Sequence, residues 1–287
     1  MIEQDKVLAC VDQSHFADHV TDYAAWAAKR MDAPLELLHT IDRHPEMGNG
    51  RDHSGAIGMN SQEILLTELT QEDEARSKAA RETGRVFLNR LRERAASAGV
   101  TQLDVRQRHG NLQDTLTAQE NRVRLFVLGR RGESAEVTQR DLGRHVEQVV
   151  RALHKPILTV TEGFTEPRRI LIAFDGGIIT RRGVEMVAAS PLFKGLPVHV
   201  LMSGAASADS PKQLDWAVGV LRAAGFEVTP HLLPGDTERV IAQTVTDQAI
   251  DLLIMGAYAH SFWRSWLFGS KTTELLRSAK LPTLLLR

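Results

Sequence analysis

KVLACVD at residues 6–12 decides the fold, because a closely similar run returns as RILIAFD at 169–175. Each run is apolar almost throughout and ends in an aspartate. A second pair of runs, LFVLGRRG at 125–132 and LLIMGAYA at 252–259, follows in the same order. Continuous apolar runs of this length are typical of strands that are covered on both faces of a sheet. The chain therefore contains two copies of one unit.

The number of residues between matching positions of the two copies takes one value in the first part of the copies and a second value in the rest. The separation is 163 residues early in the copies and 126 later, in the pairs Asp12 and Asp175, Pro34 and Pro197, Gly99 and Gly225, and Pro156 and Pro282. One insertion in the first copy, placed at about 43–75, explains the difference between these two values.

The insertion begins with a stretch rich in Gly, His and Asn and continues as helix-forming sequence. Val86, Leu88 and Leu91, with Ala79 and Ala80 a turn or two earlier, predict a buried stripe on this helix. Insertions of this kind usually lie in loops on the ligand side of a unit. We therefore expect the first part of the insertion to lie beside the binding side of the first copy.

Each copy alternates apolar strands with helix-like segments, which predicts the α/β class with a parallel, doubly wound sheet and helices on both faces. Five strands are expected in each copy. The boundary is placed in the polar segment TEGFTEP at 161–167, which predicts one domain at 1–162 and a second at 166–287. Such a short linker places the two domains side by side.

The composition excludes several classes of protein. Lys and Arg number 35 against 36 Asp and Glu, so no basic surplus indicates binding to nucleic acid or to a membrane surface. The first residues lack a basic region followed by an apolar run, so no signal peptide is expected. No apolar run reaches about 18 residues, and we expect a soluble, cytoplasmic protein. Cys10, the single cysteine, excludes an internal disulfide and is expected to be a core thiol. No histidine lies at a metal-ligand spacing, and no metal site is predicted.

Ligands of open α/β sheets bind beyond the carboxyl ends of the strands. In the second copy, Gly269-Ser270 opens the helix-like segment KTTELLRS after the fourth strand. Free N–H groups, a hydroxyl and the positive end of a helix dipole suit a phosphate. The alternative is that Ser270 is an N-cap that merely starts the helix.

The spacing around this segment points to a family. Gly256, two residues, Ala259, nine residues and then Gly269-Ser270 resemble the nucleotide-binding pattern of the universal stress protein family, with Ala259 where the family usually has Gly. Asp175, which ends the first strand, also matches the family. The resemblance covers essentially the whole chain as two copies, so the chain resembles a tandem universal stress protein.

The resemblance implies a Rossmann-like, adenine nucleotide alpha hydrolase-like fold in each copy and dimer formation through the last strand. The copies are then expected to pack as a pseudo-dimer through Ile157–Val160 and Thr283–Leu286, with a homodimer of whole chains left open. The implied ligand is an adenine nucleotide, ATP or else AMP or ADP, with Mg²⁺ as an optional companion of the nucleotide.

The resemblance also implies which residues of the second copy hold the nucleotide. Asp175 and the backbone at Met202 and Ser203 are expected to contact adenosine. The wall beside ribose and phosphates would be formed by Met255, Gly256 and Ala259. The phosphates would be bound by Gly269, Ser270 and Lys271, with Thr272 as a further hydroxyl. The methyl group of Ala259 would crowd the phosphates if that position needs a positive φ.

The first copy departs further from the family pattern. Its spacer has ten residues instead of nine, and arginine replaces the serine at the helix start. A weak second site is expected at most, made by Asp12, Thr40, Gly129, Gly132, Gly143 and Arg144. The alternative is a degenerate copy that is kept for the fold and the packing.

Three functions remain open from the sequence. The first is a stress-response module that binds adenine nucleotide, mainly in the C-terminal copy, with little or no turnover. The second is a weak ATP hydrolase, although no catalytic residues are predicted: no P-loop is present, and no carboxylate–histidine pair follows a strand. The third is a non-binding scaffold that acts through protein partners.

Overall fold

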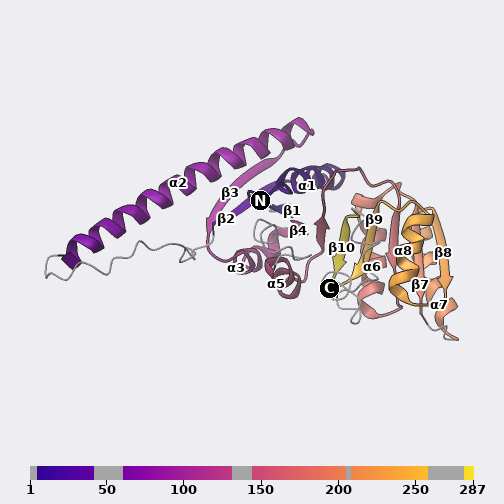
Figure 1. Ribbon diagram of the computed structural model, residues 1–287. Coiled ribbons are helices and arrows are strands. Elements are labelled where there is room, and N and C mark those ends of the chain that lie inside the picture. The colour runs from indigo at the N-terminus through magenta and orange to yellow at the C-terminus, as the bar shows by residue number, and fades with distance from the viewer. Residues whose placement is uncertain (1–4, 42–60, 131–143, 205–207, 258–280) are drawn as a thin grey trace.

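Strands and helices alternate through both copies, as the sequence predicts. The computed structural model describes residues 5–41, 61–130, 144–204, 208–257 and 281–287 (Figure 1). The first copy contributes β1 (Lys6–Cys10), α1 (Ala17–Met31), β2 (Leu35–Ile41), α2 (Ser61–Ser97), β3 (Leu103–His109), α3 (Leu112–Thr117), η1 (Glu120–Arg122), β4 (Val123–Gly129), α5 (Arg144–Ala152) and β5 (Ile157–Val160). The second contributes β6 (Ile170–Ala173), α6 (Ile178–Ala189), η2 (Pro191–Phe193), β7 (Val198–Ser203), α7 (Ser210–Ala223), β8 (Val228–Leu233), α8 (Thr237–Asp247), β9 (Leu252–Gly256) and β10 (Thr283–Leu286).

All described strands form one sheet with the order β3-β2-β1-β4-β5-β10-β9-β6-β7-β8. Neighbours are parallel within each copy, and β5 and β10 pair antiparallel. The prediction that the copies pack through these last strands is confirmed: the two strands hydrogen-bond, so that the two sheets form one. The reason is that a strand at a sheet edge presents unpaired N–H and C=O groups, and each edge satisfies the other.

The register of this pair makes the two copies symmetric. Leu158 lies opposite Leu284, and these two residues are also equivalent positions of the repeat, since they are separated by the same 126 residues as the later repeat pairs. Equivalent residues meet in this way only at a two-fold axis. The pseudo-dimer expected from the family therefore has its pseudo-two-fold axis between β5 and β10.

Helices cover both faces of the sheet. One apolar cluster joins the sheet to α1, α2, α6 and α7, and the other joins it to α3, α5 and α8. Alternate residues of each strand enter opposite clusters: in β1, Val7 and Ala9 face the first cluster and Leu8 faces the second. This is the predicted doubly wound arrangement. No described helix is both long enough and apolar enough to cross a membrane.

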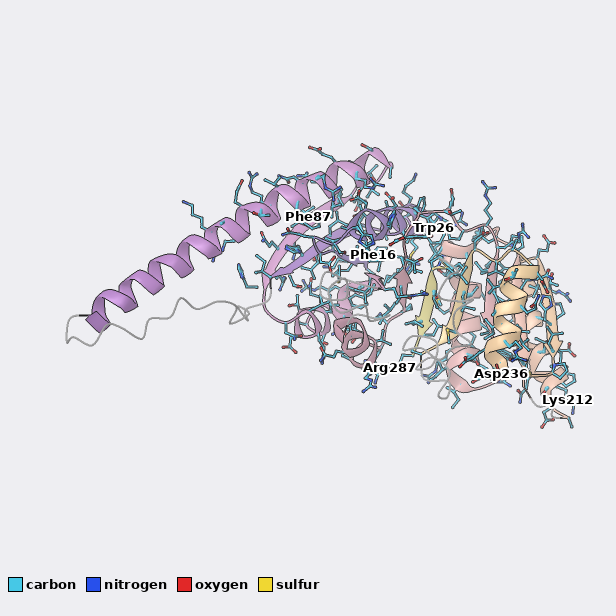
Figure 2. The ribbon with its side chains drawn as sticks, viewed as in Figure 1. Phe16, Trp26, Phe87, Lys212, Asp236 and Arg287 are labelled. Atoms are coloured by element: carbon cyan, nitrogen blue, oxygen red, sulfur yellow. The ribbon has the colours of Figure 1, made fainter. Side chains whose placement is uncertain are left out.

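The inserted helix α2 has 37 residues and is roughly 55 Å long at 1.5 Å per residue. Figure 1 shows that its N-terminal part extends well beyond the sheet, while its C-terminal part lies along β2, β3 and α1. Figure 2 shows Phe87 on the side of α2 that faces the strands. The first part of the insertion, 43–60, lies outside the described residues, so its expected place beside the first copy stays a prediction.

The buried stripe on α2 differs from the predicted one. Leu88 and Leu91 are buried, as expected, but Val86 is 57% exposed and Ala79 is also exposed. Gly84 and Ala95 complete the buried face instead. The prediction for Val86 was wrong because positions 84, 88, 91 and 95 follow the helical period, whereas 86 lies two residues from 88, on another side of the helix.

Polar contacts add to the strand pairing between the copies. Arg30 on α1 donates from Nε to the Leu192 carbonyl oxygen at 2.6 Å and also bonds the Lys194 carbonyl. The buried Tyr23 hydroxyl donates to the Gly163 carbonyl oxygen and accepts from the Thr165 amide, both at 3.4 Å. Side chains of helix α1 are thus hydrogen-bonded both to the region of η2 and to the linker.

Candidate functional site

A pocket lies at the carboxyl ends of β6, β7 and β9 in the second copy, where the sequence placed the nucleotide. Its volume is about 230 Å³. The described lining is mainly apolar with a few polar groups: Ala173, Phe174, Asp175, Thr180, Leu201, Ser203, Thr237, Ile241, Met255 and Gly256. An apolar lining with few convergent polar groups is typical of small-molecule sites.

Asp175 is fixed at the mouth of this pocket by the start of α6. Its Oδ1 accepts hydrogen bonds from the Gly177 amide at 2.8 Å and from the Thr180 hydroxyl at 2.5 Å. Such a turn, in which a carboxylate bonds the backbone two residues later, restrains the side chain. No described residue donates a hydrogen bond to Oδ2 of Asp175. One oxygen is therefore used by the fold, and the other remains an acceptor for a ligand.

Gly176 lets the chain turn between Asp175 and the helix. Its φ is +77°, a conformation that favours glycine. A Cβ atom there would lie 1.9 Å from Oε1 of Gln213, on α7. A side chain at 176 would thus strain the backbone, and the Gln213 side chain would have to move away.

The pocket brings together four of the described residues that the sequence proposed: Asp175, Ser203, Met255 and Gly256. Met202 does not line it, because its side chain enters the cluster under α6 and α7, on the opposite face of the sheet. The expected contact at Met202 was through its backbone, which stays a prediction.

Two hydroxyl groups of the lining were not predicted. Thr180 lies on α6, and Thr237 is the first residue of α8, whose N-cap Asp236 accepts a hydrogen bond from the Arg239 amide at 3.1 Å. The signal for Thr237 was present, since Asp236 follows the third strand and is a preferred N-cap residue. Thr180 carries no comparable signal, because only the folded turn brings it to Asp175.

The predicted phosphate side of this site lies outside the described residues. Ala259, Gly269, Ser270, Lys271 and Thr272 belong to the segment 258–280. Their assignment to the phosphates stays a prediction.

The first copy contains the same aspartate turn in another form. Oδ1 of Asp12 accepts from the amide of Ser14 at 3.2 Å and from its hydroxyl at 2.5 Å, so Ser14 plays the role that Gly177 and Thr180 share in the second copy. His39 Nδ1 lies 3.0 Å from the Val11 carbonyl oxygen, and its ring meets the Phe87 ring edge-on at 5.5 Å. Helix α2 thus reaches the carboxyl end of β2.

The other residues of the expected weak site are only partly described. Thr40 lies near the end of β2, and Gly129 ends β4. Arg144 is the first residue of α5, whereas Gly132 and Gly143 fall outside the described residues. The weak second site therefore stays a prediction.

Cys10 was expected to be a core thiol. It lies at the end of β1 beside the cluster that includes α5. Burial, and then the nearby charges of Glu36 and Asp12, raise the pKa of its thiol far above the usual range. A thiolate is therefore disfavoured, which argues against a nucleophilic role.

The fold and the pocket define an α/β protein with an internal two-fold repeat and a ligand pocket at the carboxyl ends of its strands. The sequence profile of the Universal stress protein family matches residues 4–161 and 166–287. Universal stress protein Slr1230 of Synechocystis sp. (strain ATCC 27184 / PCC 6803 / Kazusa) is 32% identical over 284 residues, which cover 98% of this chain and 99% of the relative.

Solved structures agree on the fold. A universal stress protein from Archaeoglobus fulgidus superposes with a TM-score of 0.66 at 18% identity, covering 99% of this chain and 97% of that one. A Pseudomonas aeruginosa structure gives 0.55 at 16% identity, with coverage of 99% and 93%. The chain belongs to the universal stress protein family and carries the family sequence twice, which confirms the predicted resemblance.

Proposed function

We propose that this chain is a stress-response protein that binds an adenine nucleotide in the pocket of its second copy and turns it over slowly or not at all. The observation that carries the proposal is the convergence of Asp175, Ser203, Met255 and Gly256, from three strand ends, on one pocket. A volume of about 230 Å³ suits a purine and its sugar better than a whole nucleotide. The phosphates would then extend toward the segment 258–280.

The chemistry of the lining favours adenine over guanine. Oδ2 of Asp175 is an acceptor, and adenine offers an exocyclic amino group as a donor. Guanine has a carbonyl oxygen at the same ring position, so it could use Oδ2 only by turning its N1–H and amino edge toward Asp175. Apolar contacts for either ring are available from the side chains of Ala173, Leu201, Ile241 and Met255.

The described lining is poorly equipped for catalysis. Asp175 is its single ionisable residue: Oδ1 of that carboxylate is bonded by Gly177 and Thr180, and Oδ2 is the acceptor proposed for the adenine amino group. A general base needs a free, correctly placed acceptor within hydrogen-bond reach of the attacking water. This supports binding rather than hydrolysis, and Mg²⁺, if bound, would accompany the phosphates.

Calorimetry with ATP on the whole chain and on Asp175→Asn tests the proposal. Asparagine keeps an Oδ1 that accepts from Gly177 and Thr180, and it replaces Oδ2 by an NH₂ donor. We expect ATP affinity to fall about tenfold or more, while the preference for ATP over GTP shrinks. Asp12→Asn, the matched change in the first copy, should leave the affinity within about twofold.

Three results would contradict the proposal: no ATP binding by the wild type, equal losses in both variants, or rapid release of ADP. The first would favour the scaffold and the third the hydrolase. Mass spectrometry of the denatured, purified protein adds an independent measurement, because a nucleotide that co-purifies would be released and weighed.

A further inference from the structure

A second and larger cavity lies in the first copy, on the face of the sheet beside α3 and η1. Its volume is about 560 Å³. It is lined by residues at the start of β1 and β2, along most of β3 and between α3 and η1: Lys6, Pro34, Leu35, Glu36, Gln102, Leu103, Asp104, Arg106, Arg108, Ala118, Gln119 and Arg122. This cavity, named the Arg106 groove below, shares no residue with the pocket at Asp175.

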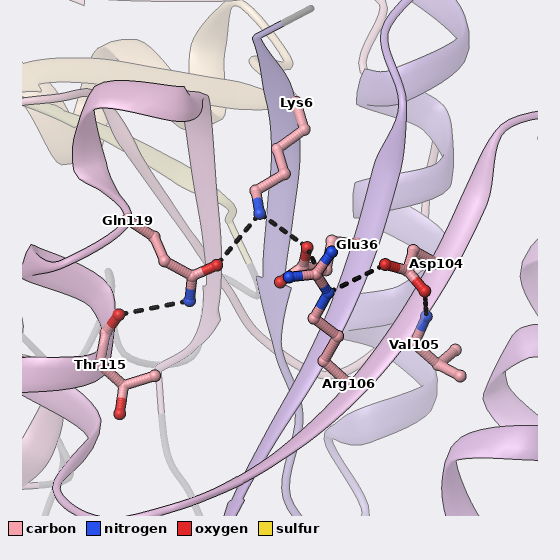
Figure 3. A network of polar contacts seen from close by, with 7 residues as sticks. All are labelled: Lys6, Glu36, Asp104, Val105, Arg106, Thr115 and Gln119. Atoms are coloured by element: carbon pink, nitrogen blue, oxygen red, sulfur yellow. Dashed lines mark hydrogen bonds and ion pairs between the residues drawn. The ribbon is translucent and has the colours of Figure 1, made fainter. Parts of the chain in front are cut away.

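The floor of the Arg106 groove is a buried ion pair. Lys6 Nζ lies 2.6 Å from Glu36 Oε2, and the two side chains are 15% and 3% exposed. Lys6 also donates to Gln119 Oε1 at 3.1 Å (Figure 3). The other carboxylate oxygen, Oε1 of Glu36, is buried without a hydrogen-bond partner among the described residues. Buried ion pairs seldom stabilise a fold better than apolar residues of similar size, so stability does not account for this one.

The second copy shows that the fold does not need these charges. The separation of 163 residues places Arg169 and His199 at the positions of Lys6 and Glu36. The strand register places His231 at the position of Arg106, because Arg106 pairs with Leu38 and His231 pairs with the equivalent Leu201. There, His199 Nδ1 lies 3.0 Å from His231 Nε2, and the two rings stack. Arg169 turns to the Gln248 carbonyl oxygen at 2.8 Å. The same place in the sheet therefore accepts a pair of imidazoles, and the buried carboxylate is particular to the first copy.

Arg106 is held so that its outer nitrogens remain available. Its Nε lies 2.9 Å from Asp104 Oδ2 and 3.3 Å from Glu36 Oε2 (Figure 3). Its two Nη atoms make no hydrogen bond with the described residues, and the side chain is 47% exposed. A guanidinium fixed through Nε presents a planar, pre-oriented fork to an oxyanion.

The charges around the Arg106 groove favour an anion. Four cationic side chains line it, against the two carboxylates of Glu36 and Asp104. Arg108, two residues after Arg106 on the same face of β3, has no ion pair or hydrogen bond from its side chain to the part of the chain that the structure describes. Its charge therefore lacks the neutralising contact that Arg106 receives from Asp104.

We propose that the Arg106 groove binds a small dianionic metabolite, a phosphate monoester or a dicarboxylate, between the guanidinium groups of Arg106 and Arg108. Both classes present paired oxygens that two guanidinium forks bind in the same way. The groove volume, within the roughly 300–1,000 Å³ of small-molecule sites, fits a metabolite of this kind. The proposal does not depend on the nucleotide pocket.

An NMR titration of the whole chain with inorganic phosphate, and separately with succinate, tests the proposal at low ionic strength. We expect saturable shifts of the backbone amides at 102–108 and 118–122 for at least one probe. Arg108→Gln should weaken binding about tenfold. Arg92→Gln, which removes the same charge from an exposed position of α2, should change the affinity by less than about twofold.

Arg106→Lys provides a second variant, because it keeps the positive charge beside Glu36 and loses the fork; it should also weaken binding. Saturation by phosphate alone identifies the ligand class as phosphate monoesters, and saturation by succinate alone identifies it as dicarboxylates. No saturation by either probe below about 10 mM would overturn the proposal. So would equal weakening by Arg108→Gln and Arg92→Gln, or shifts confined to residues outside the groove.

Discussion

Asp12 and Asp175 show how one residue type builds the same turn with different neighbours. In the first copy the partner is Ser14, and in the second it is the Gly177 amide with the Thr180 hydroxyl. The sequence identified both aspartates because each ends an apolar run. It did not identify Thr180, because a contact five residues away depends on the turn that Gly176 permits.

At the residue scale, Cys10 should react slowly with thiol reagents in the folded protein. Its thiol pKa is raised by burial and by the charges of Glu36 and Asp12, so little thiolate forms near neutral pH. Since Cys10 is the single cysteine, all labelling by a chromogenic disulfide reagent reports on it. We expect labelling in denaturant to be faster than in the native protein by at least about a hundredfold. Equal rates in the two states would contradict this.

His199 and His231 should make the second copy less stable in mild acid. Burial lowers both pKa values below 6.5, and for His199 the His231 ring and Arg169 lower the pKa further, against the opposing charge of Glu227. The unfolded chain then binds protons more readily than the folded one. This contribution to stability is present above pH 6.5 and is lost as the pH falls through the lower pKa values of the folded state.

Urea unfolding measured from pH 8 to pH 5 checks this prediction. The variant His199→Gln/His231→Gln should lose less stability over this range than the wild type, because its side chains do not titrate. The same carboxylates titrate in both proteins. The difference between the two pH profiles of stability therefore reports on the two histidines alone. Parallel pH profiles would contradict the prediction.

At the scale of elements, α2 offers a matched pair of substitutions. Leu91 is fully buried against the core, while Val86 on the same helix is 57% exposed. Leu91→Ala should lower the free energy of unfolding by about 2–5 kcal/mol, because it removes buried contacts and leaves a cavity. Val86→Ala should change it by less than about 0.5 kcal/mol. Chemical denaturation measures both, and a larger loss from Val86→Ala would show that the buried face of α2 is misassigned.

The two outer strands of the sheet are unsuited to further pairing. Proline occupies position 230 in the middle of β8, where it supplies no N–H group. At the other edge, β3 carries charged residues along its length in the sequence LDVRQRH. Charges and proline are the usual means by which edge strands avoid aggregation.

At the scale of the whole molecule, the pairing of β5 with β10 should prevent β10 from pairing with a second molecule. If residues 166–287 are produced alone, β10 loses its antiparallel partner and leaves four buried residues, Thr283–Leu286, at a free edge. We expect this fragment to dimerise through β10, with Leu284 opposite its own copy as it now lies opposite Leu158. Light scattering after size exclusion should give about twice the monomer mass.

Leu284→Arg is the control for this dimer. It would place two like charges opposite each other across the pair, so the fragment should elute as a monomer. Circular dichroism must show that the variant keeps its helices and strands. A wild-type fragment that is folded and monomeric would contradict the prediction.

The sequence predicted the repeat and the alternation of strands and helices within it, because these follow from apolar runs and constant separations. The contact through the last strands was implied by the family resemblance. It could not predict the buried face of α2 from Val86, since a long polar helix has several plausible faces until a sheet lies against one. It also gave no sign of the Arg106 groove. Lys6, Glu36 and Arg106 lie on three strands, and only the register of β1, β2 and β3 brings them together.

The short linker between the copies changes how the β5–β10 pair responds to concentration. Two separate chains with these strands would dissociate on dilution, so their pairing would depend on concentration. Here the second strand is tethered to the first, so the pairing is intramolecular and its effective concentration does not depend on expression level. Each copy always meets the same partner. Because the two copies are separate parts of one chain, Glu36 and His199 can differ at equivalent positions while the β5–β10 pair, which lies elsewhere in the sheet, stays the same.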